Sequence, residues 1–227
     1  NEVKALAVSS DGSQVNYQQL AEHSSYHSYR QLTGHLRFFD YKTLEKRNEK
    51  LSFWINLYNA LVIDAVIQQG VKESVTESWL GILGFFQKAA YIVGGQRFSL
   101  TDIEHGVLRK NRGFPYFPGP HFSESDPRWV AVIEPLDPRI HFALNCASAS
   151  CPPIGVYQPD VMDQQLDLAT RSFINAELSI DRSCYQISLS KIFQWYSIDF
   201  EGKGGILSFL QEHITDLLSA GEYLQAD

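Results

Sequence analysis

The chain has 227 residues, of which 44% are hydrophobic and 20% charged, and its formal net charge is −7 at pH 7. A chain of this size buries roughly 70% of its extended surface on folding, so one hydrophobic core can stabilise it without disulfides or metals. The net negative charge argues against nucleic acid or an anionic membrane as the main partner. We therefore predict a single domain over residues 1–227 with no nucleic-acid partner.

The apolar residues do not predict a membrane span. The most apolar region, residues 79–93, is interrupted by two glycines, Gln87 and Lys88, whereas a span needs roughly 18 uninterrupted apolar residues. We predict a soluble protein, and the sequence leaves open whether it is cytoplasmic or exported after loss of a signal peptide. The sequence gives no oligomeric state.

Hydrophobic periodicity and turn residues predict the elements in chain order. The expected elements are helices over 16–30 and 41–70, a hairpin over 90–100, a helix over 101–110, a strand over 139–146, a helix over 159–178, a hairpin over 178–189 and a closing helix over 204–220. Gly70 is expected to end the second helix, and Gly94 and Gly95 to form the turn of the first hairpin. Short hairpin-connected strands between helices favour an α+β fold, with helices packed around a small, mostly antiparallel sheet.

The three cysteines, Cys146, Cys151 and Cys184, are too few for a disulfide scaffold. Cys146 ends the predicted strand and is followed by small residues. A sharp turn there would expose the N–H groups of Ala147 and Ser148, which can lower the pKa of a thiol and hold an oxyanion. Cys146 is therefore a candidate nucleophile, although a free cysteine at the end of a strand is more often a buried apolar residue.

A thiol nucleophile needs a base nearby, and His105 is the strongest candidate. It lies in the first turns of the helix over 101–110, where the positive end of the helix dipole favours a neutral imidazole. His141 lies five residues before Cys146 and would point to the opposite face of the predicted strand, which favours a structural role. The other histidines are expected on the surface: His23, His27, His35, His121 and His213.

The acid that orients His105 stays open between Glu104 and Asp102. Thr101 and Glu104 match a capping box, which explains Glu104 structurally. Asp102 lies three residues before His105 and Arg109 four residues after it, so both share its face of the predicted helix.

Two asparagines, Asn56 and Asn59, lie on one stripe of the second helix among residues suited to burial. Buried amides need hydrogen-bond partners, so we expect these two to hold neighbouring backbone or to line a site. The cysteine and histidine spacings match no metal site, and the sequence has no phosphate-binding glycine loop. No metal and no cofactor are predicted.

Several segments resemble one protein family. They are residues 53–60 (Phe-Trp-Ile-Asn-Leu-Tyr-Asn-Ala), 98–109, 138–146, 150–153 and 193–200. Together they resemble domain-of-unknown-function family 547 of bacteria and plants. The resemblance implies a cysteine hydrolase of the papain and transglutaminase class with a Glu–His–Cys constellation, in a permuted chain order. It implies Cys146 as the nucleophile, His105 as the base and Glu104 as the partner that orients His105.

The leading hypothesis is a cysteine-dependent hydrolase, of peptidase or amidase type, that acts on a small-molecule or peptide substrate. One alternative is a non-catalytic binding or scaffold domain, and another is a thiol redox protein in which Cys146 and Cys151 form a disulfide. The residues expected to bind substrate or to support the site are Asn56, Asn59, Arg109, His141, Asn145, Ala147 and Ser148.

Overall fold

The computed structural model describes residues 16–70, 79–115, 117, 119–145, 152, 154–181, 183 and 186–214. Helices dominate this part of the chain, and its strands form two separate antiparallel hairpins, so the predicted α+β class is confirmed. The helices are α2 (Tyr17–Glu22), α3 (Ser24–Thr33), α4 (Arg47–Gln69), α5 (Trp79–Lys88), α6 (Met162–Glu177), α7 (Ile192–Trp195) and α8 (Gly202–His213). The strands are β1 (Ala90–Val93), β2 (Gln96–Ser99), β3 (Ser179–Asp181) and β4 (Gln186–Ser188).

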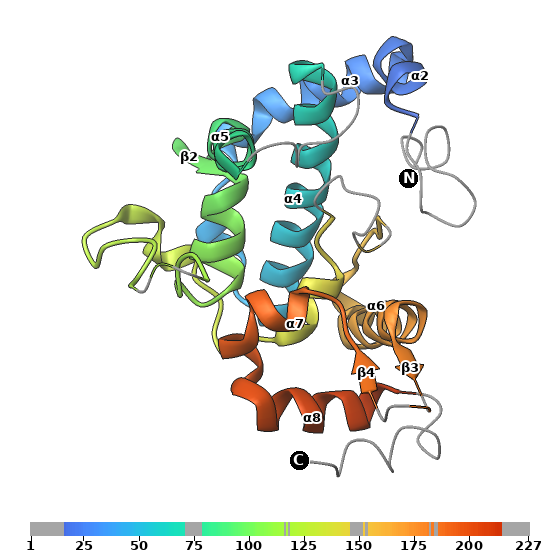
Figure 1. Cartoon of the computed structure of the whole chain (residues 1–227). Coiled ribbons are helices and arrows are strands. Elements are labelled where there is room, and N and C mark those ends of the chain that lie inside the picture. The colour runs from blue at the N-terminus through green and yellow to red at the C-terminus, as the bar shows by residue number, and fades with distance from the viewer. Residues whose placement is uncertain are drawn as a thin grey trace.

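Helix α4 runs through the middle of the molecule (Figure 1). By length and composition it could cross a membrane, but 72% of its most apolar window is buried inside the protein, as expected of a core helix. Trp54 and Tyr58 are each only 1% exposed. Gly70 ends the helix with a φ of +61°, as predicted, because a left-handed residue without a Cβ caps the last carbonyls at no steric cost.

The first predicted hairpin is confirmed, since β1 and β2 pair over their full length. Gly94 and Gly95 have φ values of +56° and +77°, which a two-residue turn between twisted strands requires. A Cβ on Gly94 would also lie 2.9 Å from the carbonyl oxygen of Phe39. Glycine is therefore needed at this position for conformation and for space.

Several helix boundaries differ from those expected. The first predicted helix breaks at His23, whose backbone is extended and whose side chain accepts a hydrogen bond from the N–H of Ser25 at the start of α3. The second begins only at Arg47, after the short 3₁₀ turn Tyr41–Thr43. In α8, the structure describes a helix that begins two residues earlier than expected and ends at His213.

The strand predicted over 139–146 is wrong, because the described part of this segment begins with a 3₁₀ helix, η5 (Pro138–Phe142). The carboxylate of Asp137 accepts from the N–H of Arg139, and Pro138 stands at the first helical position. An N-capping aspartate followed by proline starts a helical turn, and this local signal outweighs the apolar run that suggested a strand. His141 therefore lies in a helical turn, and its predicted position on the opposite face of a strand is wrong.

Two hydrophobic clusters meet at η5. Ile140 belongs to the larger cluster around α4, while Phe142 belongs to the smaller one that includes Phe193 and Phe200. In Figure 1, α7 and α8 lie at the end of the molecule opposite α2 and α3. The segment before Cys146 is thus packed between the central helix and the carboxyl-terminal helices.

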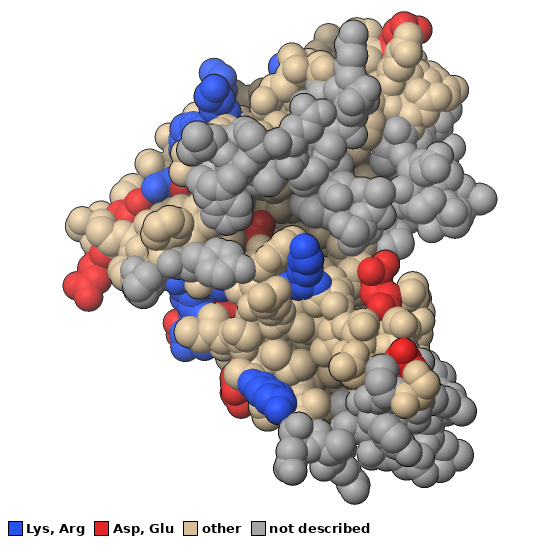
Figure 2. Space-filling view, in the orientation of Figure 1, with Lys and Arg blue, Asp and Glu red and all other residues tan. Residues whose placement is uncertain are grey.

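Charged side chains on the face drawn in Figure 2 are interspersed by sign, with Lys and Arg among Asp and Glu and many neutral residues. A nucleic-acid interface would gather positive charge on one face. The face in Figure 2 carries no such broad basic patch.

Candidate functional site

The helix that carries Glu104 and His105 is a π-helix, η3 (Asp102–Leu108). Its hydrogen bonds span five residues: the N–H of Arg109 donates to the carbonyl of Glu104 at 2.9 Å, and the N–H of Asn111 to that of Gly106 at 2.9 Å. π-helical turns are rare and occur frequently at functional sites. Because the turn is wider, the side chains that share a face differ from those expected for an ordinary α-helix, in which Asp102, His105 and Arg109 would lie together.

The capping box lies two residues before the predicted one. The hydroxyl of Ser99 accepts from the N–H of Asp102 at 3.0 Å, and the N–H of Ser99 donates to the Asp102 carboxylate at 2.8 Å. The predicted box of Thr101 and Glu104 is wrong, since Thr101 makes no side-chain cap. Glu104 is therefore not explained by capping.

Glu104 instead lies buried between two tyrosines. The hydroxyl of Tyr58 donates to its Oε2 at 3.0 Å, and that of Tyr196 to its Oε1 at 2.5 Å. Burial raises the pKa of this carboxyl, but His105, the Tyr196 hydroxyl and Arg109 together outweigh burial and lower it. Glu104 is therefore a buried, ionised carboxylate. Burial and the negative charge of Glu104 raise the pKa of both tyrosines well above the usual value.

His105 is 5% exposed and contacts both Arg109 and Glu104. Its Nδ1 lies 2.8 Å from Nη1 of Arg109 and 3.8 Å from Oε1 of Glu104. A guanidinium always donates, so Nδ1 accepts, and the neutral ring carries its hydrogen on Nε2. Burial is the main reason that the pKa of His105 falls to about 4, with Arg109 adding to it and Glu104 opposing it. The expected neutral imidazole therefore arises from burial.

Arg109 connects His105 to a second buried carboxylate, Asp199. Arg109 is 1% exposed, and its Nε and Nη2 donate to the Asp199 oxygens at 2.5 and 3.1 Å. Nε2 of His141 lies 2.9 Å from the same carboxylate, and its ring stacks on Tyr196 at 4.0 Å between centroids. Burial raises the pKa of Asp199, but His141 and Arg109 lower it well below the usual range.

These contacts place the predicted residues Glu104, His105, Arg109 and His141 in one buried network. Sequence reasoning missed Tyr196 and Asp199 as members of it. Both lie in the segment 193–200 that supported the family resemblance. The sequence signal that could have identified them is their position in an aromatic segment, because polar groups in such surroundings are expected to be buried with hydrogen-bond partners.

The two asparagines of α4 hold backbone, as expected. Nδ2 of Asn59 donates to the carbonyl of Ala143 at 2.9 Å, and its Oδ1 accepts from the N–H of Asn145 at 2.9 Å. Asn56 makes the same pair of contacts with the backbone of Tyr157, at 2.8 and 2.9 Å. Asn59 therefore fixes the backbone of Ala143 and Asn145. Asn145 is the residue directly before Cys146.

The predicted nucleophile Cys146, the neighbouring Ala147 and Ser148, and also Cys151 lie outside the described residues. The chain is described on both sides of this segment. Nδ2 of Asn145 donates to the carbonyl of Pro152 at 2.8 Å. The residues that flank 146–151 are thus joined by a side-chain hydrogen bond.

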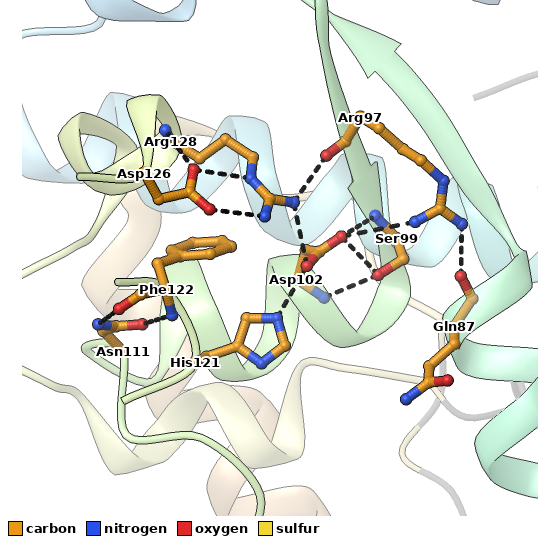
Figure 3. Close-up of polar contacts among 9 residues, drawn as sticks. All are labelled: Gln87, Arg97, Ser99, Asp102, Asn111, His121, Phe122, Asp126 and Arg128. Atoms are coloured by element: carbon orange, nitrogen blue, oxygen red, sulfur yellow. Dashed lines mark hydrogen bonds and ion pairs between the residues drawn. The ribbon is translucent and has the colours of Figure 1, made fainter. Parts of the chain in front are cut away.

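Asp102, the other candidate for orienting His105, orients a different histidine (Figure 3). Nε2 of His121 lies 2.8 Å from Oδ1 of Asp102. The rings of His121 and His105 are neighbours, with centroids 6.5 Å apart. Sequence reasoning placed His121 on the surface, because nothing in its loop indicates that the chain folds back onto η3.

Among the described residues, no group of three or more His, Cys, Asp or Glu side chains is arranged to hold a metal ion. The polar network is instead composed of pairs in which each carboxylate faces an arginine, a tyrosine or a histidine. Such an arrangement holds charge and protons in fixed places, which suits either proton transfer or structural support.

Comparisons with known proteins identify a family but no activity. No curated protein and no solved structure matches the chain. A family model described as "Protein of unknown function, DUF547" matches residues 41–174, which is more than half of the chain. This range includes Glu104, His105 and Cys146, while Tyr196 and Asp199 lie beyond it. The chain therefore belongs to the DUF547 family of proteins of unknown function.

Proposed function

We propose that the protein is a cysteine-dependent hydrolase in which Cys146 attacks an amide, peptide or thioester-like bond of a small-molecule or peptide substrate. The observation that carries the proposal is the use of two consecutive residues of α4. Tyr58 donates to Glu104, and Asn59 brackets the backbone that leads into Cys146. One rigid helix thus holds both Glu104, which is adjacent to His105 in the chain, and the backbone that leads to the thiol, as catalysis by positioned groups requires.

The hydrogen bonds of His105 define what this residue can contribute. To accept the thiol proton at Nε2, the ring would need its other proton on Nδ1, where Arg109 now donates. His105 serves as the base only if Arg109 turns away. In the arrangement described, Nε2 instead carries a hydrogen, and a thiolate or a developing oxyanion would be a suitable acceptor for it.

The Cys146→Ala variant tests the proposal, with Cys184→Ala as the matched control. We expect Cys146→Ala to abolish hydrolysis of p-nitrophenyl acetate, an activated ester used as a general probe, and Cys184→Ala to leave it unchanged. In the parent protein iodoacetamide should alkylate Cys146 selectively below pH 7, because a poised thiol is ionised there.

The protein must be reduced before alkylation, because a disulfide between Cys146 and Cys151 would block the thiol. The Asn145–Pro152 hydrogen bond joins the two ends of the segment that contains both cysteines. Undiminished ester hydrolysis by Cys146→Ala protein of unchanged melting temperature would contradict the proposal. A Cys146 that reacts only on unfolding would favour the scaffold alternative.

A further inference from the structure

A cavity of about 420 Å³ lies between three parts of the fold. They are α3 with the 3₁₀ helix that continues it, η1 (Gly34–Phe38), the carboxyl-terminal half of α4, and the junction of α5 with β1. Its volume falls within the range of roughly 300–1,000 Å³ that is typical of small-molecule sites. None of the described residues that line it belongs to the network around Glu104, so the cavity is a separate site. In Figure 1, α3 and α5 lie at the end of the molecule opposite α7 and α8.

The charged side chains that line this cavity are mostly cationic. Among the described lining residues the cations are Arg30, Arg37 and Lys88, and the one carboxylate is Asp64. Three cations against one carboxylate leave a formal excess of two positive charges, in a chain whose net charge is −7. A concave surface lined by one sign of charge concentrates ligands of the opposite sign. The cavity is therefore suited to an anion.

Asp64 does not oppose such a ligand directly, because three groups of the protein already bind its carboxylate. Its Oδ1 accepts from the hydroxyl of Tyr26 at 2.6 Å, and its Oδ2 accepts from the hydroxyl of Tyr91 at 2.7 Å and from Nη1 of Arg30 at 2.6 Å. The Asp64 side chain is 4% exposed, whereas that of Arg30 is 42% exposed. The buried carboxylate thus fixes the guanidinium of Arg30 at the wall of the cavity.

The N–H groups of Arg30 that Asp64 does not use are available to a ligand. Within the described residues, neither Nε nor Nη2 of Arg30 has a hydrogen-bond partner. A guanidinium that is held through one nitrogen presents the others in a fixed direction, which lowers the entropy lost on binding. Arg30 is thus an oriented donor rather than a freely moving surface charge.

The other two cations, Arg37 and Lys88, make no side-chain hydrogen bond or ion pair within the part of the chain that the structure describes. Basic residues near helix ends often bind the last carbonyls of the helix. At α5, however, Arg97 already donates to the last two carbonyls. In η1, the carbonyl of Leu36 accepts from two backbone N–H groups. Capping of these helices therefore does not account for Arg37 and Lys88.

Apolar side chains form another part of the cavity wall. They are Leu61 and Ala65 of α4, Ala89 before β1, and Ile92 of β1, of which Ile92 is 41% exposed. An inorganic anion would leave this apolar surface in contact with water. A small apolar group attached to the anion would cover it, which is favourable.

We infer that this cavity binds a small organic phosphate monoester, whose phosphate group lies among Arg30, Arg37 and Lys88. A phosphate monoester carries close to two negative charges at neutral pH and has three terminal oxygens. Its charge matches the excess of positive charge, and its oxygens match the number of cations. A carboxylate has one charge and two oxygens, and would leave a cation without a partner. Binding here does not involve Cys146, so the inference is independent of the proposed function.

The test is calorimetric titration of the full chain with phenyl phosphate at constant ionic strength and about pH 7.5, where the ester is a dianion. We expect saturable binding with a Kd of about 1 mM or tighter. Arg37→Gln and Lys88→Gln should each weaken it by roughly fivefold to tenfold, because each removes a charge-assisted hydrogen bond. Lys203→Gln in α8 is the matched control: it removes the same charge from an exposed position and should leave the Kd unchanged.

Arg30→Lys tests the fixed guanidinium. Lysine keeps a positive charge beside the buried Asp64 but lacks the planar fork of donors. We expect this variant to keep its fold and to bind phenyl phosphate roughly fivefold to tenfold more weakly. Melting temperatures identify any variant that has lost its fold.

Three further ligands define the chemistry of the site. Phthalate has an aromatic ring and two negative charges, but it carries them on two carboxylates, so we expect it to bind about tenfold more weakly. Inorganic phosphate should also bind about tenfold more weakly, because it does not cover the apolar wall. A phosphoserine peptide should bind no more tightly than phenyl phosphate, because the cavity holds one small group.

Each part of the inference has an outcome that contradicts it. It is wrong if phenyl phosphate does not bind saturably, or if folded Arg37→Gln and Lys88→Gln proteins bind it as the parent does. Equal binding of phthalate would contradict selection of phosphate, and equal binding of inorganic phosphate would contradict an organic ligand. Tighter binding of the peptide would mean that the partner is a phosphorylated protein. None of these results bears on ester hydrolysis by Cys146, which is measured separately.

Discussion

His105 is neutral because it is buried, and not because of its position in a helix. His105 sits beside an ionised glutamate, which favours a charged ring, yet desolvation outweighs the glutamate and lowers the pKa of the ring. For Glu104 the balance is reversed, because His105, the Tyr196 hydroxyl and Arg109 together outweigh its burial and lower its pKa. Burial and neighbouring groups thus leave His105 neutral and Glu104 charged.

This difference predicts how stability depends on pH. Unfolded His105 takes up a proton as the pH falls below about 6.5, while the folded residue does so only near pH 4. Protons therefore favour the unfolded chain in this window, and the contribution of a neutral His105, about 3 kcal/mol above pH 6.5, is lost as the pH falls towards 4. Urea denaturation at pH 7, 5.5 and 4 measures it.

The matched comparison is His105→Gln, which has no proton to gain. We expect the deficit in free energy of unfolding of His105→Gln, relative to the parent, to shrink by about 3 kcal/mol from pH 7 to pH 4. The titrating groups that do not contact His105 are common to both proteins and cancel in this difference. A deficit that does not change with pH would contradict the pKa assigned to His105.

At the scale of elements, η3 gathers the polar network because its hydrogen bonds are wider than those of an α-helix. Asp102 faces His121, Glu104 faces two tyrosines, and His105 faces Arg109. The contact of His105 with Arg109 agrees with the sequence-based expectation, and that of Asp102 does not. Rare helical geometry is retained where close packing and hydrogen bonds compensate for it.

Gly106→Ala tests this packing. In an ordinary exposed helix the change would stabilise by about 1 kcal/mol, because alanine is the better helix former. Here the new methyl group would overlap the Phe122 ring, so we expect a loss of roughly 1–3 kcal/mol. Gly84→Ala in α5 is the control, since nothing lies within 4 Å of its added Cβ, and it should stabilise by about 0.4–1 kcal/mol.

Thermal denaturation of the two glycine variants measures whether the loop of His121 packs against η3 at Gly106. Equal stabilisation by both substitutions would mean that the loop of His121 does not rest on η3. Opposite signs would support the close approach of this loop to η3.

For the whole molecule, α4 organises the candidate site. Its residues contact η3 through Tyr58, the approach to Cys146 through Asn59, and the segment before α6 through Asn56. Segments that are 46, 84 and 101 residues from these positions are thereby brought to one helix. Because α4 is buried on most sides, small displacements of these contacts are resisted by the whole core.

Asn59→Ala should therefore affect both stability and the thiol. It removes the hydrogen bonds that Asn59 makes with the carbonyl of Ala143 and the N–H of Asn145, at a cost of roughly 2–4 kcal/mol. We expect slower alkylation of Cys146 as well, because the backbone before it is no longer fixed. Asn56→Ala removes an equivalent pair of bonds at Tyr157 and should lower stability without changing Cys146 reactivity. Equal effects of the two variants on alkylation would contradict a specific role for Asn59.

The sequence by itself determined what local chemistry can determine. The glycine turn between β1 and β2, the end of α4 at Gly70, the α+β class and the burial of Asn59 follow from backbone freedom and hydrophobic pattern. The main error in predicting local structure was at η5. An apolar run there fits a strand as well as a helical turn, and the Asp-Pro start favours the helical turn.

Only the tertiary structure decided which polar side chains meet. The partners of Glu104, Arg109 and Asp102 come from segments up to 92 residues away, so no spacing along the chain encodes them. The assignment of Asp102 to His121 rather than His105 depends on a π-helical turn and on the space left by Gly106. Both are consequences of packing, in which buried charges must find partners wherever the folded chain brings them together.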